Sequence, residues 1–239
     1  MRRIGVCKAA VRALGLGALL VVAACAAQQP QVGGVHEGVF TIAGRAVPLP
    51  PGQWRLAGSD HQANLNPQGS AGYSSALLVQ ELAGRVVGVV VVGAQVPSSE
   101  TLVYLRARQS FTCQPDSSIA PTIANIVIDY GFDCRRIGAQ NLRNWRPSPV
   151  PVPWQTFLTQ RDANPQAVPG RMIWFQFARG DRRGGMTLTY YFDPAAGERT
   201  GMADATEVER ARATRWADAS LPLVAQGFTG GTTSPAPAF

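Results

Sequence analysis

The chain has 239 residues, of which 15% are charged, and its formal net charge is +7. Four basic residues and no acidic ones lie in residues 1–24, so the rest of the chain carries a net charge of only +3. These remaining charges are interspersed, and nucleic acid is therefore not an expected partner. No lysine follows Lys8, which excludes a Walker-type phosphate loop and a lysine Schiff base from the remainder of the chain.

The N-terminus has the layout of a secretory signal. Its four basic residues precede an uncharged apolar run over residues 13–24. This run is too short to cross a bilayer comfortably, because a membrane-spanning helix needs about 20 apolar residues. Residues 1–24 are therefore predicted to be a signal peptide rather than a transmembrane anchor.

The apolar run ends in Val22-Ala23-Ala24-Cys25, which resembles the lipobox of bacterial lipoproteins. The resemblance implies cleavage before Cys25, a diacylglycerol on its sulfur and an acyl chain on its new amine. Ala26 is not the aspartate that retains lipoproteins at the inner membrane of well-studied Gram-negative bacteria. The expected location is thus the cell envelope, anchored in the outer membrane and facing the periplasm. Ordinary cleavage after Ala26, which would release a soluble periplasmic product, is the alternative.

Composition divides the rest of the chain into a tether, one domain and a tail. Residues 25–36 are expected to form a lipid-anchored flexible tether, and residues 37–228 a single globular domain. Residues 229–239 are rich in Gly, Thr, Ser, Pro and Ala, and are expected to be disordered. The final Phe239 is interpreted as incidental.

The predicted elements of the domain are mostly β, in chain order. Alternating or continuously apolar segments rich in β-branched residues predict strands, and pairs of them separated by glycine-containing turns predict hairpins. These are a hairpin over 39–47, a short strand over 54–57, a hairpin over 75–95, an undecided strand or helix over 102–108, an extended segment over 124–130, an irregular proline-rich segment over 144–154, a short helix over 154–161 and a hairpin over 171–192. Residues 89–92 are all valine, which indicates a central strand buried on both faces.

The last predicted element is a helix over residues 205–219, with a capping box formed by Thr206 and Glu209. Its expected buried face contains Ala205, Val208, Trp216, Ala219 and Leu223. Arg212 falls on the same face and is expected to bury its stem and reach a carboxylate. Pro222 is expected to kink or end the helix.

Strands in hairpins followed by a long helix predict an α+β domain, with an antiparallel sheet and the C-terminal helix packed on one face. A mostly-β sandwich is the alternative.

Beyond Cys25, the cysteines available for pairing are Cys113 and Cys134, which are predicted to form a disulfide in an oxidising compartment. Such a loop should stabilise the fold by about 3 kcal/mol in the chain-entropy model. Two cysteines and two scattered histidines lack the spacing of a zinc site. No metal and no cofactor are expected.

No catalytic residue is predicted. Ser59, Asp60 and His61 are adjacent, but neighbouring residues in an extended chain point apart and do not form a triad. Carboxylate pairs for glycoside chemistry cannot be assigned from the sequence.

Four arginines are candidates for binding an anion such as phosphate or a lipid headgroup: Arg135, Arg136, Arg182 and Arg183. The alternative for the last two is a solvated hairpin tip. Three tryptophans near the proline-rich segment either line a groove for glycan or peptide or pack in the core, namely Trp145, Trp154 and Trp174.

The sequence therefore predicts an envelope lipoprotein whose first partner is the membrane, reached through its lipid anchor. The domain is expected to be a non-catalytic module that binds an envelope protein or the cell wall, or that supports an assembly. Two alternatives stay open. One is an envelope hydrolase assembled from distant residues, with His61 as its base. The other is a small-ligand carrier with an apolar pocket near Trp174.

Overall fold

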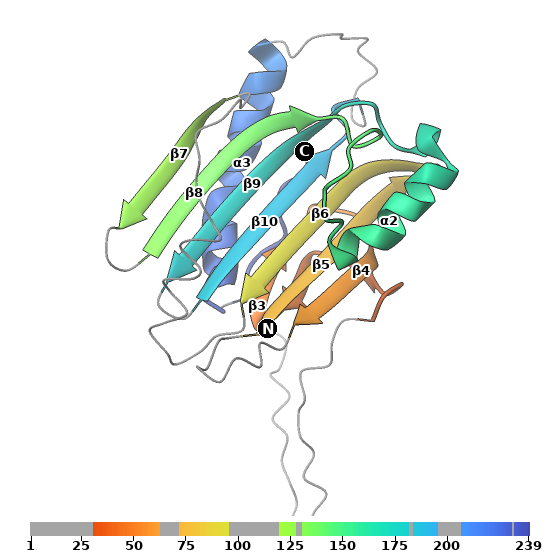
Figure 1. Cartoon of the computed structure of the whole chain (residues 1–239). Helices are drawn as coiled ribbons and strands as arrows, with labels where there is room; N and C mark the ends of the chain where they lie inside the picture. The colour runs from red at the N-terminus through yellow and green to blue at the C-terminus, as the bar shows by residue number, and fades with distance from the viewer. Residues whose placement is uncertain are drawn as a thin grey trace, which may run out of the picture.

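The protein folds around one eight-stranded antiparallel sheet (Figure 1). The structure, a computed structural model, describes residues 31–62, 72–95, 120–127, 131–181, 184–195, 207–230 and 232–239. In spatial order the strands are β1 (Val35–His36), β4 (Trp54–Gln62), β5 (Tyr73–Leu82), β6 (Arg85–Gln95), β10 (Gly184–Phe192), β9 (Met172–Asp181), β8 (Gly131–Gln140) and β7 (Ala120–Val127). The predicted α+β class with an antiparallel sheet is confirmed.

Two of the predicted hairpins turn in the same way. A separate two-stranded sheet is formed by β2 (Val39–Ile42) and β3 (Arg45–Pro48), and its turn holds Ala43 and Gly44 at φ values of 48° and 71°. The turn between β5 and β6 holds Ala83 and Gly84 at 50° and 74°. Positive φ at both central residues matches the twist of antiparallel strands, which explains why a glycine occupies each turn.

One face of the sheet is covered by α3 (Glu207–Phe228) together with the β2–β3 hairpin. In Figure 1 this helix lies behind the sheet. The core on this side is aromatic: Trp216 of α3 lies 4.6 Å from the ring of Phe175 and 5.1 Å from the ring of Tyr190, measured between centroids. The predicted packing of a C-terminal helix on the sheet is therefore confirmed.

The opposite face is covered in part by α2 (Val152–Ala163), which is followed by a 3-10 turn over Pro165–Ala167. Trp154, Phe157 and Leu158 of α2 are buried against the sheet on this side. Gly58 of β4 allows this contact, since a Cβ atom there would lie 2.3 Å from the carbonyl oxygen of Pro153. The sheet is thus covered by helices on both faces, whereas the sequence predicted a packed helix on only one.

The buried face of α3 differs from the prediction. Val208 is 73% exposed and Ala219 is also exposed, while the buried residues are Ala213, Trp216, Ala217, Ser220, Val224, Gly227 and Phe228. The helix continues through Pro222, because the two turns that follow it are held by the burial of Val224 and Phe228. The guanidinium of Arg212 lies 4.6 Å from the centre of the Phe239 ring rather than extending to the expected carboxylate. Thr206 lies outside the described residues.

Both ends of the domain reach beyond the predicted limits of 37 and 228. Val35 and His36 pair with β4 as β1, and the amide of Gly33 donates to the carbonyl of Leu56 at 2.8 Å. These residues were expected to belong to the tether.

The expected disorder of residues 229–239 is wrong for residues 232–239. The amide of Ala236 donates to the carbonyl of Leu49 at 3.1 Å, and the indole of Trp216 donates to the carbonyl of Pro237 at 2.9 Å. A polar and proline-rich composition does not prevent packing where the backbone has such partners. Within the described part of the chain, no helix is long and apolar enough to cross a membrane.

Candidate functional site

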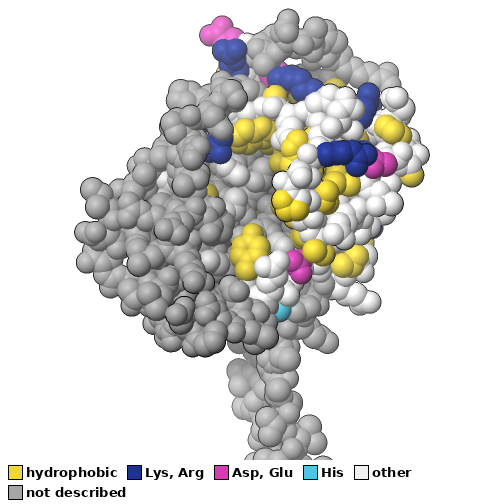
Figure 2. All heavy atoms as spheres, in the orientation of Figure 1, with side chains coloured by type: hydrophobic (Ala, Val, Ile, Leu, Met, Phe, Trp, Pro, Cys, Tyr) yellow, Lys and Arg dark blue, Asp and Glu magenta, His cyan; other side chains and the backbone are white. Residues whose placement is uncertain are grey.

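A groove of about 380 Å³ lies between the start of α2 and the sheet. This volume falls in the range of small-molecule sites. Its lining residues come from the sheet (Asp60, Gln62, Tyr73, Ser75, Val91, Val92, Gly93, Thr187 and Thr189) and from the segment entering α2 (Val150, Pro151, Val152, Pro153 and Trp154). The space-filling view shows the molecule hollowed on this side, with hydrophobic and acidic side chains along the margin (Figure 2).

Strand register brings the polar side chains of the groove together. Asp60 is paired with Ser75, Ser75 with Gly93, and Gly93 with Thr187, so these four residues form one row across β4, β5, β6 and β10. Residues directly opposite one another in neighbouring strands share a face of the sheet. The row therefore presents one carboxylate and two hydroxyls to the groove.

Gly93 makes room for the ring of Tyr73 within this row. A Cβ atom at Gly93 would lie 1.8 Å from the phenolic oxygen of Tyr73, so any side chain there would displace the tyrosine. Burial raises the pKa of Tyr73, and the nearby carboxylate of Asp60 raises it further. The phenol consequently stays protonated at neutral pH and remains able to donate a hydrogen bond.

Thr187 has a polar atom that the described chain leaves unsatisfied. Its Oγ1 is buried and has no hydrogen-bond partner among the described residues. Leaving a buried hydroxyl unpaired costs about 1–3 kcal/mol, which makes such a group a candidate for satisfaction by a ligand. Thr189, two residues further along β10, is 9% exposed and lines the same groove.

The wall opposite the sheet is apolar and well supported. Trp154 is 5% exposed, and its ring lies 4.6 Å from that of Trp145 and 6.1 Å from that of Tyr191. Val150 and Val152 flank it and are 38% and 47% exposed. Asp60 is the only charged residue that lines the groove within the described part of the chain. The site thus combines hydroxyls, one carboxylate and an aliphatic rim.

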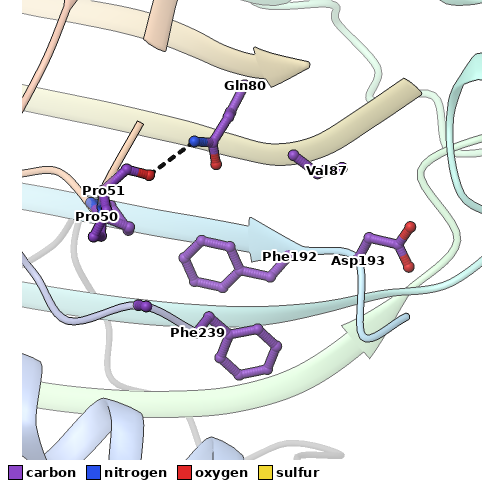
Figure 3. A pocket seen from close by; sticks show the side chains of 8 residues that line it. Pro50, Pro51, Gln80, Val87, Phe192, Asp193 and Phe239 are labelled. Carbon is purple, nitrogen blue, oxygen red and sulfur yellow. Dashed lines mark hydrogen bonds between the residues drawn. The ribbon is translucent and has the colours of Figure 1, made fainter. Parts of the chain in front are cut away.

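A second hollow of about 150 Å³ lies where the C-terminus meets β10 (Figure 3). Its polar groups are already bonded within the protein: Gln80 donates to the carbonyl of Pro51 at 2.9 Å, and Asp193 accepts from Arg85 at 3.0 Å and from the amide of Ala195 at 3.0 Å. Its volume is smaller and its polar atoms are engaged. This hollow is therefore less suited to a ligand than the groove.

The structure does not bring the candidate anion-binding arginines to one surface. Arg135 and Arg136 are neighbours on β8 and point to opposite faces of the sheet. Arg135 is buried beneath α3, where its guanidinium pairs with Asp218. On the other face Arg136 donates to Gln176 at 3.1 Å and lies 5.4 Å from the ring centre of Trp174. Arg182 and Arg183 lie outside the described residues.

His61 is placed on β4 rather than in a loop, and it points away from Asp60. Its Nδ1 lies 2.8 Å from the Oγ of Ser74 on the neighbouring strand, while Asp60 accepts from Gln62 at 3.0 Å. The expectation that adjacent residues would point apart is confirmed, and Ser74 was not found from the sequence. No cluster of three or more His, Cys, Asp or Glu able to hold a metal occurs in the described ranges.

Of the three tryptophans, Trp154 fits both interpretations, because it is buried and also lines the groove. Trp174 packs against Gly138 of β8, where a Cβ atom would lie 2.3 Å from its ring, and it does not line the groove. The hollow therefore lies beside Trp154 rather than Trp174.

Cys134 is 4% exposed on β8, and Cys25 and Cys113 lie outside the described residues, so the lipid anchor and the disulfide stay predictions.

No protein-family model, curated protein or solved structure matches this chain.

Proposed function

We propose that this protein is a membrane-anchored binding module of the bacterial envelope that holds a small, neutral, hydroxyl-rich ligand, such as a sugar, in the groove between α2 and the sheet. The observation that carries the proposal is the buried Oγ1 of Thr187, which lacks a partner within the described chain and lines a groove of about 380 Å³. A ligand hydroxyl would supply the missing hydrogen bond.

The chemistry of the lining favours a sugar over other small ligands. Tyr73, Ser75, Thr187 and Thr189 offer hydroxyls that both donate and accept, which suits a ligand whose own groups are hydroxyls. The carboxylate of Asp60 accepts from such groups and repels anions. The wall around Trp154 suits the apolar C–H face of a sugar ring.

The same lining favours binding over turnover. Hydrolysis of a glycosidic bond generally needs two carboxyl groups flanking the bond, and the described groove contributes only that of Asp60. His61 faces the other side of β4. A module that holds its ligand fits these residues better than an enzyme does.

Titration with two neutral disaccharides, gentiobiose and chitobiose, followed by tryptophan fluorescence, tests the proposal. We expect saturable binding of at least one of them. Thr187→Val should weaken that binding about tenfold, because it removes one hydrogen bond at nearly constant volume. Thr41→Val, at an exposed position on β2, is the matched control and should bind as the wild type does. Failure of both sugars to bind, or equal loss in both variants, would contradict the proposal.

Anchoring through Cys25 is the second part of the proposal. Lipid on this cysteine holds the module at the membrane, since two or more acyl chains give stable attachment. Intact-mass measurement on protein purified from envelopes should show the acyl groups. A bare sulfur at Cys25, or protein that washes freely from the envelope, would contradict it.

A hydrolase is the second candidate, and one observation favours it: the 2.8 Å contact between Ser74 Oγ and His61 Nδ1. A fluorophosphonate probe tests this pair, because it labels serines activated by a neighbouring base. Labelling of Ser74 that is lost in His61→Ala would favour the hydrolase. The binding-module proposal expects no labelling.

A further inference from the structure

We infer that the ligand of the groove is the neutral headgroup of a membrane glycolipid, taken up at the end of the domain from which the anchor leaves. The inference rests on the proposed function, and it adds the source of the sugar. Three features carry it: the direction of the N-terminal segment, its length, and the apolar rim of the groove.

The N-terminal segment leads toward the groove end of the sheet. β1 pairs antiparallel to the start of β4, with His36 opposite Trp54 and Val35 opposite Arg55. Gly34 and Gly33 continue from β1 along β4 in the direction of its last residues, since the amide of Gly33 donates to the carbonyl of Leu56, and the described chain ends in a turn in which the amide of Gly34 donates to the carbonyl of Gln31. Asp60 and Gln62 of the groove lie at that end, to which the arrowheads of β4 and β6 both point (Figure 1).

The chain between this point and the predicted anchor is short. The step from Cys25 to Gln31 spans six residues, and an extended chain covers at most about 20 Å over that length. An acylated Cys25 would thus hold Gln31, which lies beside β4, within about 20 Å of the bilayer, and so keep the groove end of that strand near the bilayer. The ligands that this end meets at the highest local concentration are the headgroups of that bilayer.

The rim of the groove suits a ligand with hydrocarbon attached. Val150 and Val152 are 38% and 47% exposed and place two apolar side chains together at the margin of the groove. A free sugar has little apolar surface with which to cover these two valines. The glycerol and the first methylenes of a glycolipid supply such a surface. Asp60 is the only charge on the described lining, which favours an uncharged headgroup over a phosphate-bearing one.

Vesicle co-sedimentation of the full mature chain carrying Cys25→Ser tests the inference, because this variant has no acyl chains of its own. The vesicles are phosphatidylcholine with and without gentiobiosyl diacylglycerol. We expect retention only on the glycolipid vesicles, and release by excess free gentiobiose.

Two variants distinguish the contribution of the apolar rim to vesicle retention from that of the hydroxyls inside the groove. Val150→Asp with Val152→Asp should reduce retention on glycolipid vesicles at least tenfold, a larger factor than the one by which it weakens binding of free gentiobiose. Thr187→Val should weaken both. Val208→Asp, at a 73% exposed position on α3, is the matched control and should change neither.

The outcomes distinguish this inference from the proposed function. Binding of free sugar without vesicle retention overturns the headgroup inference and leaves the binding module in place. Equal retention on both vesicle types also overturns it, because headgroup recognition is then absent. Absence of both sugar binding and retention overturns the inference and the proposed function together.

Discussion

The ring of Phe239, the last residue of the chain, stacks on the ring of Phe192 at the end of β10, with centroids 4.9 Å apart and planes inclined by 14°. The same ring lies edge-on to Phe175 at 5.3 Å. The C-terminus therefore closes the aromatic core between the sheet and α3. Phe239, which belongs to the segment that the composition predicts to be disordered, therefore contributes to the stability of the domain.

Phe239→Ala should lower the free energy of unfolding by about 2 kcal/mol. Full truncation of a buried phenylalanine costs about 3–5 kcal/mol, and Phe239 is only partly buried, so the expected loss is smaller. Urea denaturation followed by circular dichroism measures it. Val208→Ala, at an exposed position, should change stability by less than about 0.5 kcal/mol. Equal stability of the Phe239 variant and the wild type would mean that the tail does not pack on the core.

Asp218→Ala should destabilise the protein by about 1–2 kcal/mol, whereas Arg135→Met should be close to neutral. Arg135 is buried under α3, and burial lowers the pKa of its guanidinium. Removing Asp218 leaves a buried charge without its partner, while a methionine replaces the charge by apolar volume. The cost is moderated because Asp218 itself is largely exposed. Chemical denaturation of both variants, with Glu37→Ala as an exposed acidic control, checks the ranking. A larger loss of stability in Arg135→Met than in Asp218→Ala would contradict this ranking.

Acidification should destabilise the domain in part through His36. Burial lowers the pKa of this imidazole below its ordinary value of 6.5, and its ring packs edge-on to Phe40 at 4.9 Å. The unfolded chain then binds the proton at a higher pH than the folded chain does. The stabilising contribution is therefore complete above about pH 6.5 and is lost as the pH falls through the folded pKa. His36→Phe keeps the aromatic contact and should flatten the loss of stability between about pH 7 and pH 5. An unchanged slope in urea unfolding would exclude this role.

The predicted disulfide between Cys113 and Cys134 is tested by mass. Reduction should add two hydrogen atoms to the mature chain and should lower the melting temperature, because the crosslink restricts the unfolded chain. Cys113→Ser should reproduce the loss of stability and abolish the mass change on reduction. Detection of two alkylatable thiols in the unreduced protein would refute the pairing.

The elements that the sequence predicts well are those set by local patterns. Strand alternation and the Ala-Gly turns at 43–44 and 83–84 fixed the hairpins, because turn chemistry and cross-strand pairing act over short separations. The length of β4 was underestimated. The run from Gly58 to His61 has a polar, loop-like composition, but pairing with β5 holds it extended.

The face of α3 was mispredicted because small residues decide its packing. A Cβ atom at Gly227 would lie 1.9 Å from the carbonyl oxygen of Ala46, so this glycine lets the helix approach β3 closely. Hydrophobic periodicity favours large side chains and gives no weight to such a contact. It therefore placed the exposed Val208 on the buried face and missed Ser220 and Gly227.

The groove was only partly accessible from the sequence. Thr187 and Thr189 alternate with buried apolar residues, a pattern that indicates a polar stripe on one face of a strand, whereas Tyr73 and Ser75 are separated by the polar Ser74 and show no such pattern. The sequence does not show that β10 lies beside β6. This non-local pairing brings Thr187 into the same row as Asp60 and Ser75.

Indole N–H resonances in two-dimensional NMR test the central claim most directly. Each tryptophan contributes one signal, and Trp154 lies on the opposite face of the sheet from Trp54 and Trp216. The groove site predicts that adding gentiobiose or chitobiose shifts the resonance of Trp154, which lines the groove. The resonances of Trp54 and Trp216, buried in the core on the other face, should stay in place. Saturating sugar that leaves Trp154 unmoved, or that shifts Trp216 and not Trp154, would contradict the account.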